Sequence, residues 1–324
     1  MWKQKIVQVY RTIMHGIMQS SCMIDARLRV LQVLADRGTL TAAADDLGYT
    51  PSAVSAQLRA LSRDVGAPLV EREGRGLRLT AAGRTLLERS DELFARWGAI
   101  HADVLAAGGG GLGRLRLAGF STAASALLVE VATAVRSAHP EVEMQIIEAE
   151  PLACFEMLLA DRADIAVVVA GGQLPASDDP RFEQQPLLVD ALDLLVPPHH
   201  RLAARERVRL ADAASEPWIT DRPGSIYADL AYAACAEAGF TPRQAHVATE
   251  WDTAAAMVAA GLGVALIPRL ARLPDEALVR VPLRGSGAPV RHVRTSIRRG
   301  TSRQPEIAWG LAELRDVAAR VSTL

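Results

Sequence analysis

Between residues 40 and 61 the apolar positions recur with a helical period and predict two helices joined by a tight turn. Leu47, Val54 and Leu58 would form a small apolar core where the two helices meet. Gly48 would end the first helix, because glycine is common at helix ends and unfavourable inside them. The pattern predicts a helix-turn-helix, although an ordinary pair of packed helices would show the same spacing.

The second of these helices has a clear start signal and a polar face near its N-terminus. Thr50 is a good N-cap, and Pro51 takes the first helical position, where its missing N–H costs nothing. The exposed residues that follow are short or basic: Ser52, Ser55, Ala56 and Arg59. A helix that enters the major groove reaches base edges and phosphates with such residues. This face is therefore the candidate DNA-reading surface.

A glycine-flanked, arginine-rich segment follows the helix pair. Gly74 and Gly76 mark a hairpin, and the alternation of Arg and Leu over residues 75–79 predicts a short two-stranded wing. Between residues 50 and 84 six arginines face three acidic residues, while the whole chain has a net charge of −1. We therefore predict a local DNA-binding patch; a solvated charged hairpin is the alternative. The predicted DNA contacts are Thr50, Pro51, Ser52, Ser55, Arg59, Arg72, Arg75 and Arg78.

The next segment has the spacing of a coiled-coil helix. Residues at alternating intervals of four and three form one apolar row with a single polar member: Leu86, Ser90, Leu93, Trp97, Ile100 and Val104. Such a row favours pairing with a second copy of the chain; a helix lying on its own domain is the alternative. The glycine run at 108–113 would end this helix as a flexible joint.

The order of these segments resembles the LysR-type transcriptional regulators. The resemblance extends from Ile24 to the C-terminus, and its most specific part is residues 40–83, which end in Leu79-Thr80-Ala81-Ala82-Gly83. The chain departs from the family at Ala56, where arginine is frequent, and at Pro51-Ser52, which replaces the more usual Gln-Pro. The resemblance implies an α/β regulatory region of two Rossmann-like subdomains, similar to a periplasmic binding protein.

Beyond the glycine run, short apolar strands alternate with helices, which predicts parallel sheets flanked by helices. The resemblance implies that the chain crosses between the two subdomains near 190–194 and again between 283 and 293. The expected organisation is an N-terminal extension of unknown role (1–22), a winged helix-turn-helix (23–84), a dimerising linker helix (85–107), a hinge (108–113) and an effector-binding domain (114–324). Within that domain, subdomain I would comprise about 114–190 and 291–324, and subdomain II about 191–290.

Three strand–helix junctions of the predicted effector-binding domain carry polar side chains. Ligands of open α/β sheets bind beyond the carboxyl ends of strands, where helix N-termini offer free N–H groups. The candidate effector contacts are Ser121, Thr122, Arg222, Gly224, Ser225, Trp251, Asp252 and Thr253. Hydroxyls beside an arginine suit a small anion or a polar metabolite. The same residue types are also common helix caps, so each position has a purely structural interpretation as well.

Composition and motifs argue against an enzyme. The sequence shows no nucleophile elbow, phosphate loop, dinucleotide fingerprint or metal-ligand spacing, so we expect no catalysis, cofactor or metal. Cys22, Cys154 and Cys235 are scattered, which fits a cytoplasmic protein without a disulfide framework. Residues 1–22 lack the long apolar stretch of a signal peptide or membrane span.

These patterns together predict a sequence-specific DNA-binding transcriptional regulator whose C-terminal cleft binds a small-molecule effector and so alters the geometry of DNA binding. Its expected partners are a double-stranded DNA operator, the effector, a second copy in a homodimer or homotetramer and, for an activator, RNA polymerase. Two alternatives stay open. One is a solute-binding or assembly protein without a DNA role, and the other is a regulator of the same family that needs no effector.

Overall fold

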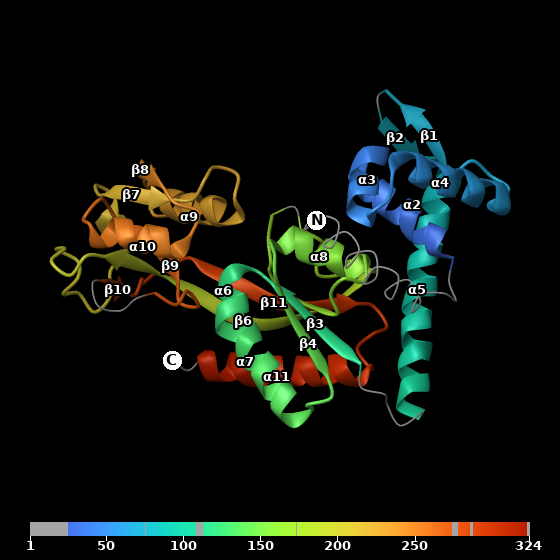
Figure 1. Cartoon of the computed structure of the whole chain (residues 1–324). Coiled ribbons are helices and arrows are strands. Elements are labelled where there is room, and N and C mark those ends of the chain that lie inside the picture. The colour runs from blue at the N-terminus through green and yellow to red at the C-terminus, as the bar shows by residue number, and fades with distance from the viewer. Residues whose placement is uncertain are drawn as a thin grey trace, which may run out of the picture. The chain divides into compact units, whose positions relative to one another are not determined.

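The computed structural model describes residues 25–74, 76–107, 113–172, 174–273, 278–285 and 288–322, and the chain forms two compact units, 1–101 and 102–324 (Figure 1). The predicted extension at 1–22, Arg75 and all of the predicted hinge except Gly113 lie outside the described residues. No described helix is both long enough and apolar enough to cross a bilayer.

The first unit contains the predicted helix pair, turn and wing. Its elements are α2 (Ala26–Arg37), α3 (Leu40–Leu47), α4 (Pro51–Val65), the strands β1 (Val70–Glu73) and β2 (Gly76–Leu79), and most of α5 (Ala81–Ala107), whose residues from 102 onward belong to the second unit. Gly48 ends α3 in the left-handed conformation at φ 67°. Leu31, Val54 and Leu58 lie in one buried core, together with Ala43 and Ala44. The apolar period of the sequence therefore corresponds to the core face of these helices.

The second unit is built on a mixed sheet that passes through two α/β subdomains. Among the described residues the strand order is β10-β6-β11-β5-β3-β4, and β9 pairs with the far half of β6. Subdomain I contains β3 (Arg114–Gly119), α6 (Ser121–Ala123), the π-helical turn Ala124–Leu128, α7 (Val129–Ala138), β4 (Glu143–Glu148), α8 (Pro151–Leu159), β5 (Ile165–Val169) and α11 (Pro305–Val321). Subdomain II contains the 3-10 turn Leu210–Ala213, β7 (Pro217–Thr220), α9 (Ile226–Glu237), β8 (Arg243–Val247), α10 (Trp251–Ala259), β9 (Ala265–Pro268) and β10 (Val279–Val281).

Two long strands, β6 (Phe182–Val196) and β11 (Val290–Arg298), connect the subdomains. They run antiparallel to each other, and β11 is also antiparallel to β5, whereas β3, β4 and β5 are parallel. The prediction of parallel sheets is therefore correct for β3, β4 and β5 of subdomain I and for the separate pair β7 and β8 of subdomain II. It is wrong for the connecting strands, because every pair that β6 or β11 forms is antiparallel. Pro186 interrupts the apolar pattern of β6, and it is tolerated because β6 forms the edge of the sheet in subdomain I.

Helices cover both faces of the sheet in subdomain I. Leu117 and Val167 point into a core shared with α7 and α11, while their neighbours Ala118 and Val168 point into a second core beneath α8. Because successive strand residues face opposite sides, α8 lies across the sheet from α7 and α11 (Figure 1). Gly310 of α11 allows a close approach, since a Cβ there would lie 2.7 Å from Ile165.

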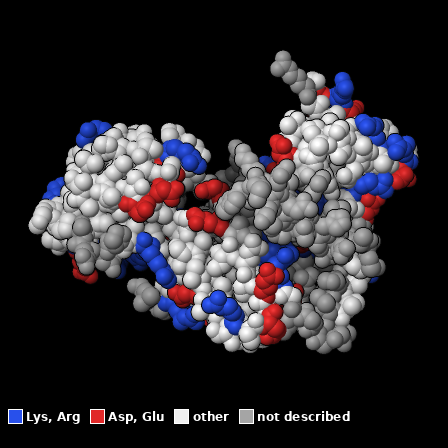
Figure 2. Space-filling model, viewed as in Figure 1, with Lys and Arg blue, Asp and Glu red and all other residues white. Residues whose placement is uncertain are grey.

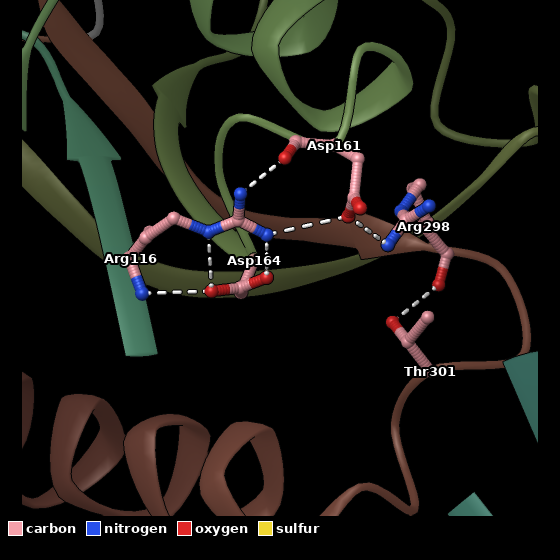
Figure 3. A network of polar contacts seen from close by, with 5 residues as sticks. All are labelled: Arg116, Asp161, Asp164, Arg298 and Thr301. Atoms are coloured by element: carbon pink, nitrogen blue, oxygen red, sulfur yellow. Dashed lines mark hydrogen bonds and ion pairs between the residues drawn. The ribbon is translucent and has the colours of Figure 1, made fainter. Parts of the chain in front are cut away.

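A buried polar network joins the end of α8 to three strands (Figure 3). Arg116 of β3 donates to both carboxylate oxygens of Asp164, at 2.6 and 3.0 Å, and also reaches Asp161. Arg298, at the end of β11, donates to the same Asp161 at 2.6 Å. Asp161 has a positive φ of 56°, which aims its carboxylate between the two arginines. The network fixes these elements of subdomain I to one another.

Candidate DNA interface and ligand site

The start of α4 is built as the sequence predicts. The Thr50 hydroxyl accepts a hydrogen bond from the Ala53 N–H at 3.2 Å, and Pro51 opens the helix. Ser52, Ala56 and Arg59 are exposed along one face, while Ser55 is half-buried beside them. The Arg59 guanidinium donates to the Ser55 hydroxyl at 2.6 Å, which orients it along this face. The face presents short hydroxyls followed by one cationic group.

The arginines of the wing differ in their surroundings. Arg78 lies opposite Glu71 in the strand register and forms an ion pair with it at 2.9 Å. Arg72 lies on the other face of the hairpin and is exposed. Arg75, the third predicted contact of the wing, lies outside the described residues. Figure 2 shows basic side chains gathered along one edge of the first unit with acidic ones among them.

The Thr80–Gly83 segment of the family-like motif is structural. The Thr80 hydroxyl donates to the Pro68 carbonyl at 2.7 Å and accepts from the Gly83 N–H at 3.0 Å. A Cβ at Gly83 would lie only 2.1 Å from the Leu69 carbonyl oxygen. Glycine is therefore needed where α5 crosses the segment before the wing.

The predicted dimerisation row divides into two parts. Leu86 packs against the core of its own unit, and Ser90 is buried with its hydroxyl bonded to the Leu86 carbonyl. Leu93, Ile100 and Val104 are 48%, 45% and 61% exposed, and Trp97 lies half-buried between them. The apolar surface that could meet a second copy therefore begins at Leu93.

The three predicted ligand junctions all lie where a strand passes into a helix. Ser121 and Thr122 begin α6, which is separated by one residue from the end of β3 at Gly119, and the π-helical turn Ala124–Leu128 follows α6. Arg222, Gly224 and Ser225 lie between β7 and α9, and Trp251, Asp252 and Thr253 open α10 after β8. The π-helical turn is notable because such turns are frequent at functional sites.

Thr122 is already engaged within the protein. Its side chain is buried, and its hydroxyl accepts from the Arg291 guanidinium at 2.9 Å. Arg291 also forms an ion pair with Asp190 at 2.5 Å and lies over the Phe120 ring. Asp190 in turn accepts from the Leu270 N–H at 3.1 Å. Arg291 and Asp190 lie on β11 and β6, so this cluster sits where the subdomains are joined.

The other junction residues divide into structural and exposed groups. The Ser225 hydroxyl caps α9 by accepting from the Ala228 N–H at 3.0 Å. Trp251 packs edge-on against Tyr227, with the ring centroids 4.6 Å apart. Burial raises the pKa of the Tyr227 phenol, whose hydroxyl donates to the Leu266 carbonyl. Arg222, Gly224, Asp252 and Thr253 are exposed.

Sequence reasoning missed the charged pairs on the connecting strands. Besides Asp190 and Arg291, Asp193 of β6 pairs with Arg269 at 2.9 Å. The available signal was the pair of aspartates within the apolar run of 187–196, since buried carboxylates require partners.

The described cysteines are not built for redox chemistry. Cys154 and Cys235 are free and buried, and they lie in different cores. Burial raises the pKa of each thiol to about 12, so the reactive thiolate is scarce at neutral pH. Within the part of the chain that the structure describes, no group of His, Cys, Asp or Glu could hold a metal ion.

Both units of the chain match domains of known proteins. Residues 26–84 match the bacterial regulatory helix-turn-helix protein, lysR family, and residues 108–319 match the LysR substrate binding domain. The chain is 32% identical over 262 residues to the small neutral protease regulatory protein of Streptomyces coelicolor, covering 78% of this chain and 76% of that protein.

Two further relatives place the chain among regulators rather than enzymes. The DNA-binding transcriptional dual regulator OxyR of Escherichia coli is 27% identical, with 76% of this chain and 80% of OxyR covered. The structure of full-length CbnR complexed with its target DNA superposes with a TM-score of 0.53 at 25% identity, covering 90% and 98% of the two chains. The capped helix pair, the wing, the long helix and the two-subdomain α/β unit therefore have one explanation: the chain belongs to the LysR family of DNA-binding transcriptional regulators.

Proposed function

We propose that α4 reads the operator and that Arg59 is its principal cationic contact. The observation that carries this proposal is the exposed face of α4, where Ser52, Ser55 and Arg59 follow one another. Arg59 has no acidic partner among the described residues, whereas Arg78 is paired with Glu71. A guanidinium without an acidic partner loses less interaction energy on binding a phosphate or a guanine edge than one that must first leave an ion pair.

Selection from a pool of random duplexes at two salt concentrations tests this proposal. We expect the full-length protein to enrich an inverted repeat, with affinity falling as salt rises. Arg59→Ala should weaken binding to the selected site about tenfold or more. Arg136→Ala, which removes an exposed arginine from α7, is the matched control and should bind as the wild type does. Equal affinity of the Arg59 variant and the control would contradict the role of Arg59.

We further propose that the exposed row from Leu93 to Val104 pairs two copies into a homodimer, which could associate further into a homotetramer. A contiguous apolar row on a helix favours burial against a second helix. Ile100→Glu places a charge in this row and should lower the assembly state measured by light scattering. Arg96→Glu adds the same side chain at an exposed position of α5 outside the row and should leave assembly unchanged.

The effector proposal rests on the three junctions and on the family of the second unit. We propose a small polar ligand that meets Ser121, Arg222 and Thr253 and changes the angle between the subdomains. The ligand must bind one arrangement more tightly than the other, since equal affinity would shift nothing. Arg222 is the one arginine among the predicted contacts, so it would bind an anionic group of the ligand. Arg291, which lies beside Thr122, is already paired with Asp190. Figure 2 shows acidic side chains around the hollow between the two lobes of this unit.

A panel of anionic, neutral and cationic metabolites tests this proposal by the shift in melting temperature of the full-length protein. A ligand whose effect disappears in Ser121→Val and persists in Ser137→Val supports the site. An unchanged effect in the first variant contradicts it. We propose that the regulator acts in the cytoplasm, where its operator lies, and contacts RNA polymerase if it is an activator.

A further inference from the structure

An arginine-lined cavity lies in subdomain II, apart from the three strand–helix junctions. Its volume is about 390 Å³. The residues that line it come from the segment between β6 and β7 and from the turn after β10: Arg201, Leu202, Arg205, Arg207, Val208, Arg209, Asp212 and Arg284. None of the residues predicted to contact the effector belongs to this lining.

The backbone explains why the arginines face outward together. Val208 and Leu283 form an isolated parallel bridge, and both side chains are buried in the core of subdomain II. Two hydrogen bonds hold this bridge, from the Val208 N–H to the Pro282 carbonyl at 3.1 Å and from the Arg284 N–H to the Val208 carbonyl at 2.9 Å. Alternate residues of extended chain face opposite sides, so Arg207, Arg209 and Arg284 point away from the core.

The charges of the lining are not balanced. Arg201 pairs with Glu216 at 2.7 Å, and Arg209 pairs with Asp212 at 3.0 Å. Arg205, Arg207 and Arg284 are exposed, and no described acidic side chain forms an ion pair with any of the three. Asp212, the one carboxylate of the lining, is paired with Arg209 and also attracts Arg284 at longer range, so the lining holds five arginines and a single acidic group. Like charges held close together repel one another, and an anion placed among them would remove that repulsion.

We propose that this cavity binds a small ligand with two or more negative charges, of the diphosphate or polyphosphate class. Guanidinium groups match phosphate oxygens with paired hydrogen bonds, and five of them surround one volume here. Known small-molecule sites have volumes from about 300 Å³ upward, so the cavity is large enough for such a ligand. The two paired arginines are held in place, while the three that form no ion pair supply most of the excess positive charge.

The concave shape favours a small ligand over the DNA backbone as the source of phosphate. A duplex presents its phosphates along an extended backbone, whereas a cavity of about 390 Å³ has room only for a small ligand. The proposal does not depend on the operator or the effector sites proposed above, because it uses none of their residues.

Isothermal titration of the full-length protein with inorganic pyrophosphate tests the proposal, and orthophosphate, which has one phosphorus and less negative charge, is the comparison. We expect pyrophosphate to bind more tightly than orthophosphate and its affinity to fall as salt rises. Arg207→Ala combined with Arg284→Ala should weaken pyrophosphate binding at least tenfold. Arg243→Ala, which removes an exposed arginine of β8 outside the cavity, should leave that binding unchanged.

Urea unfolding of the double variant and its binding to a selected operator are measured in parallel. An unchanged unfolding transition shows that subdomain II still folds, and operator affinity reports whether these arginines contact DNA. Loss of pyrophosphate binding with the unfolding transition and the DNA affinity retained supports the proposal. Absence of pyrophosphate binding to the wild-type protein overturns it, as does equal binding by the wild type and the double variant. Normal pyrophosphate binding with weakened DNA binding would also overturn it and would assign the arginines to the DNA backbone.

Discussion

On α4 the polar side chains near the helix start face solvent, whereas at the start of α6 the Thr122 side chain is 2% exposed and bonded to Arg291. The partners also differ in distance along the chain. Arg59 bonds to Ser55, four residues away, and Thr122 bonds to a residue 169 positions away. The first surface is available to a partner as it stands, while the second holds two subdomains together. A ligand at α6 must therefore act on a cluster that is already part of the fold.

Removing Arg291 gives the largest effect that this comparison predicts. Arg291→Leu leaves the buried Asp190 carboxylate without its counter-ion, which should lower the free energy of unfolding by about 3–5 kcal/mol. Urea unfolding of the effector-binding unit within the full-length protein measures this change. Operator affinity of the folded variant should change little if α4 is independent of the cluster.

The double variant Asp190→Asn with Arg291→Leu provides the control for this prediction. It removes both charges, so its loss of stability should be smaller than the sum of the single losses by about 1–3 kcal/mol. Additive losses would show that Asp190 and Arg291 do not stabilise each other.

The two helix caps provide a smaller and more closely matched comparison. Thr50 caps α4 and Ser225 caps α9, each through one hydrogen bond to a backbone N–H three residues on. Thr50→Ala and Ser225→Ala should each lower the free energy of unfolding by about 1 kcal/mol. Only Thr50→Ala should also weaken operator binding, because only Thr50 lies on the proposed DNA-reading face. Equal DNA affinity for the two variants would remove Thr50 from that face.

The buried thiols of Cys154 and Cys235 should not react with an alkylating reagent near neutral pH while the protein is folded. With pKa values of about 12, Cys154 and Cys235 expose about one thiolate in 10,000 at pH 8. In a Cys22→Ser background, iodoacetamide should label neither residue of the folded protein at pH 8 and both after unfolding. Because the shift is upward, labelling of the folded protein should rise only as pH approaches 12. Rapid labelling at pH 8 would mean that one of these cores opens readily.

The first unit could be predicted from the sequence because its determinants are local. The cap at Thr50, the helix end at Gly48 and the hairpin at Gly74 each depend on residues within a few positions, and all are present. The sequence could not predict that the apolar row on α5 divides into a part that packs in the core and a part that is exposed. Leu86 follows the same spacing as Leu93, and only the packing of the wing and α2 against α5 shows that Leu86 belongs to the core.

The connecting strands escaped prediction for the opposite reason. The first half of β6 shows no strand pattern in the sequence, because Gln184, Gln185 and Pro186 disrupt the alternation of apolar residues there. What holds this half of β6 is pairing with β11, more than a hundred residues away. The three ligand junctions were found because caps and strand ends are local signals. The Asp190–Arg291 pair was not found, since nothing near either residue in sequence identifies the other.

The double-stranded connection also restricts how the subdomains can move. A pair of loops would let them rotate about many axes, but two paired strands resist sliding and shearing through every hydrogen bond of their ladder. Bending is easiest where the β6–β11 register shifts, between Val293 and Arg294. This shift lies within a few residues of the Asp190–Arg291 pair. The two-stranded connection should therefore bend most easily beside the Asp190–Arg291 ion pair. A single residue inserted into either strand would shift the register and turn one member of this ion pair to the opposite face of the sheet.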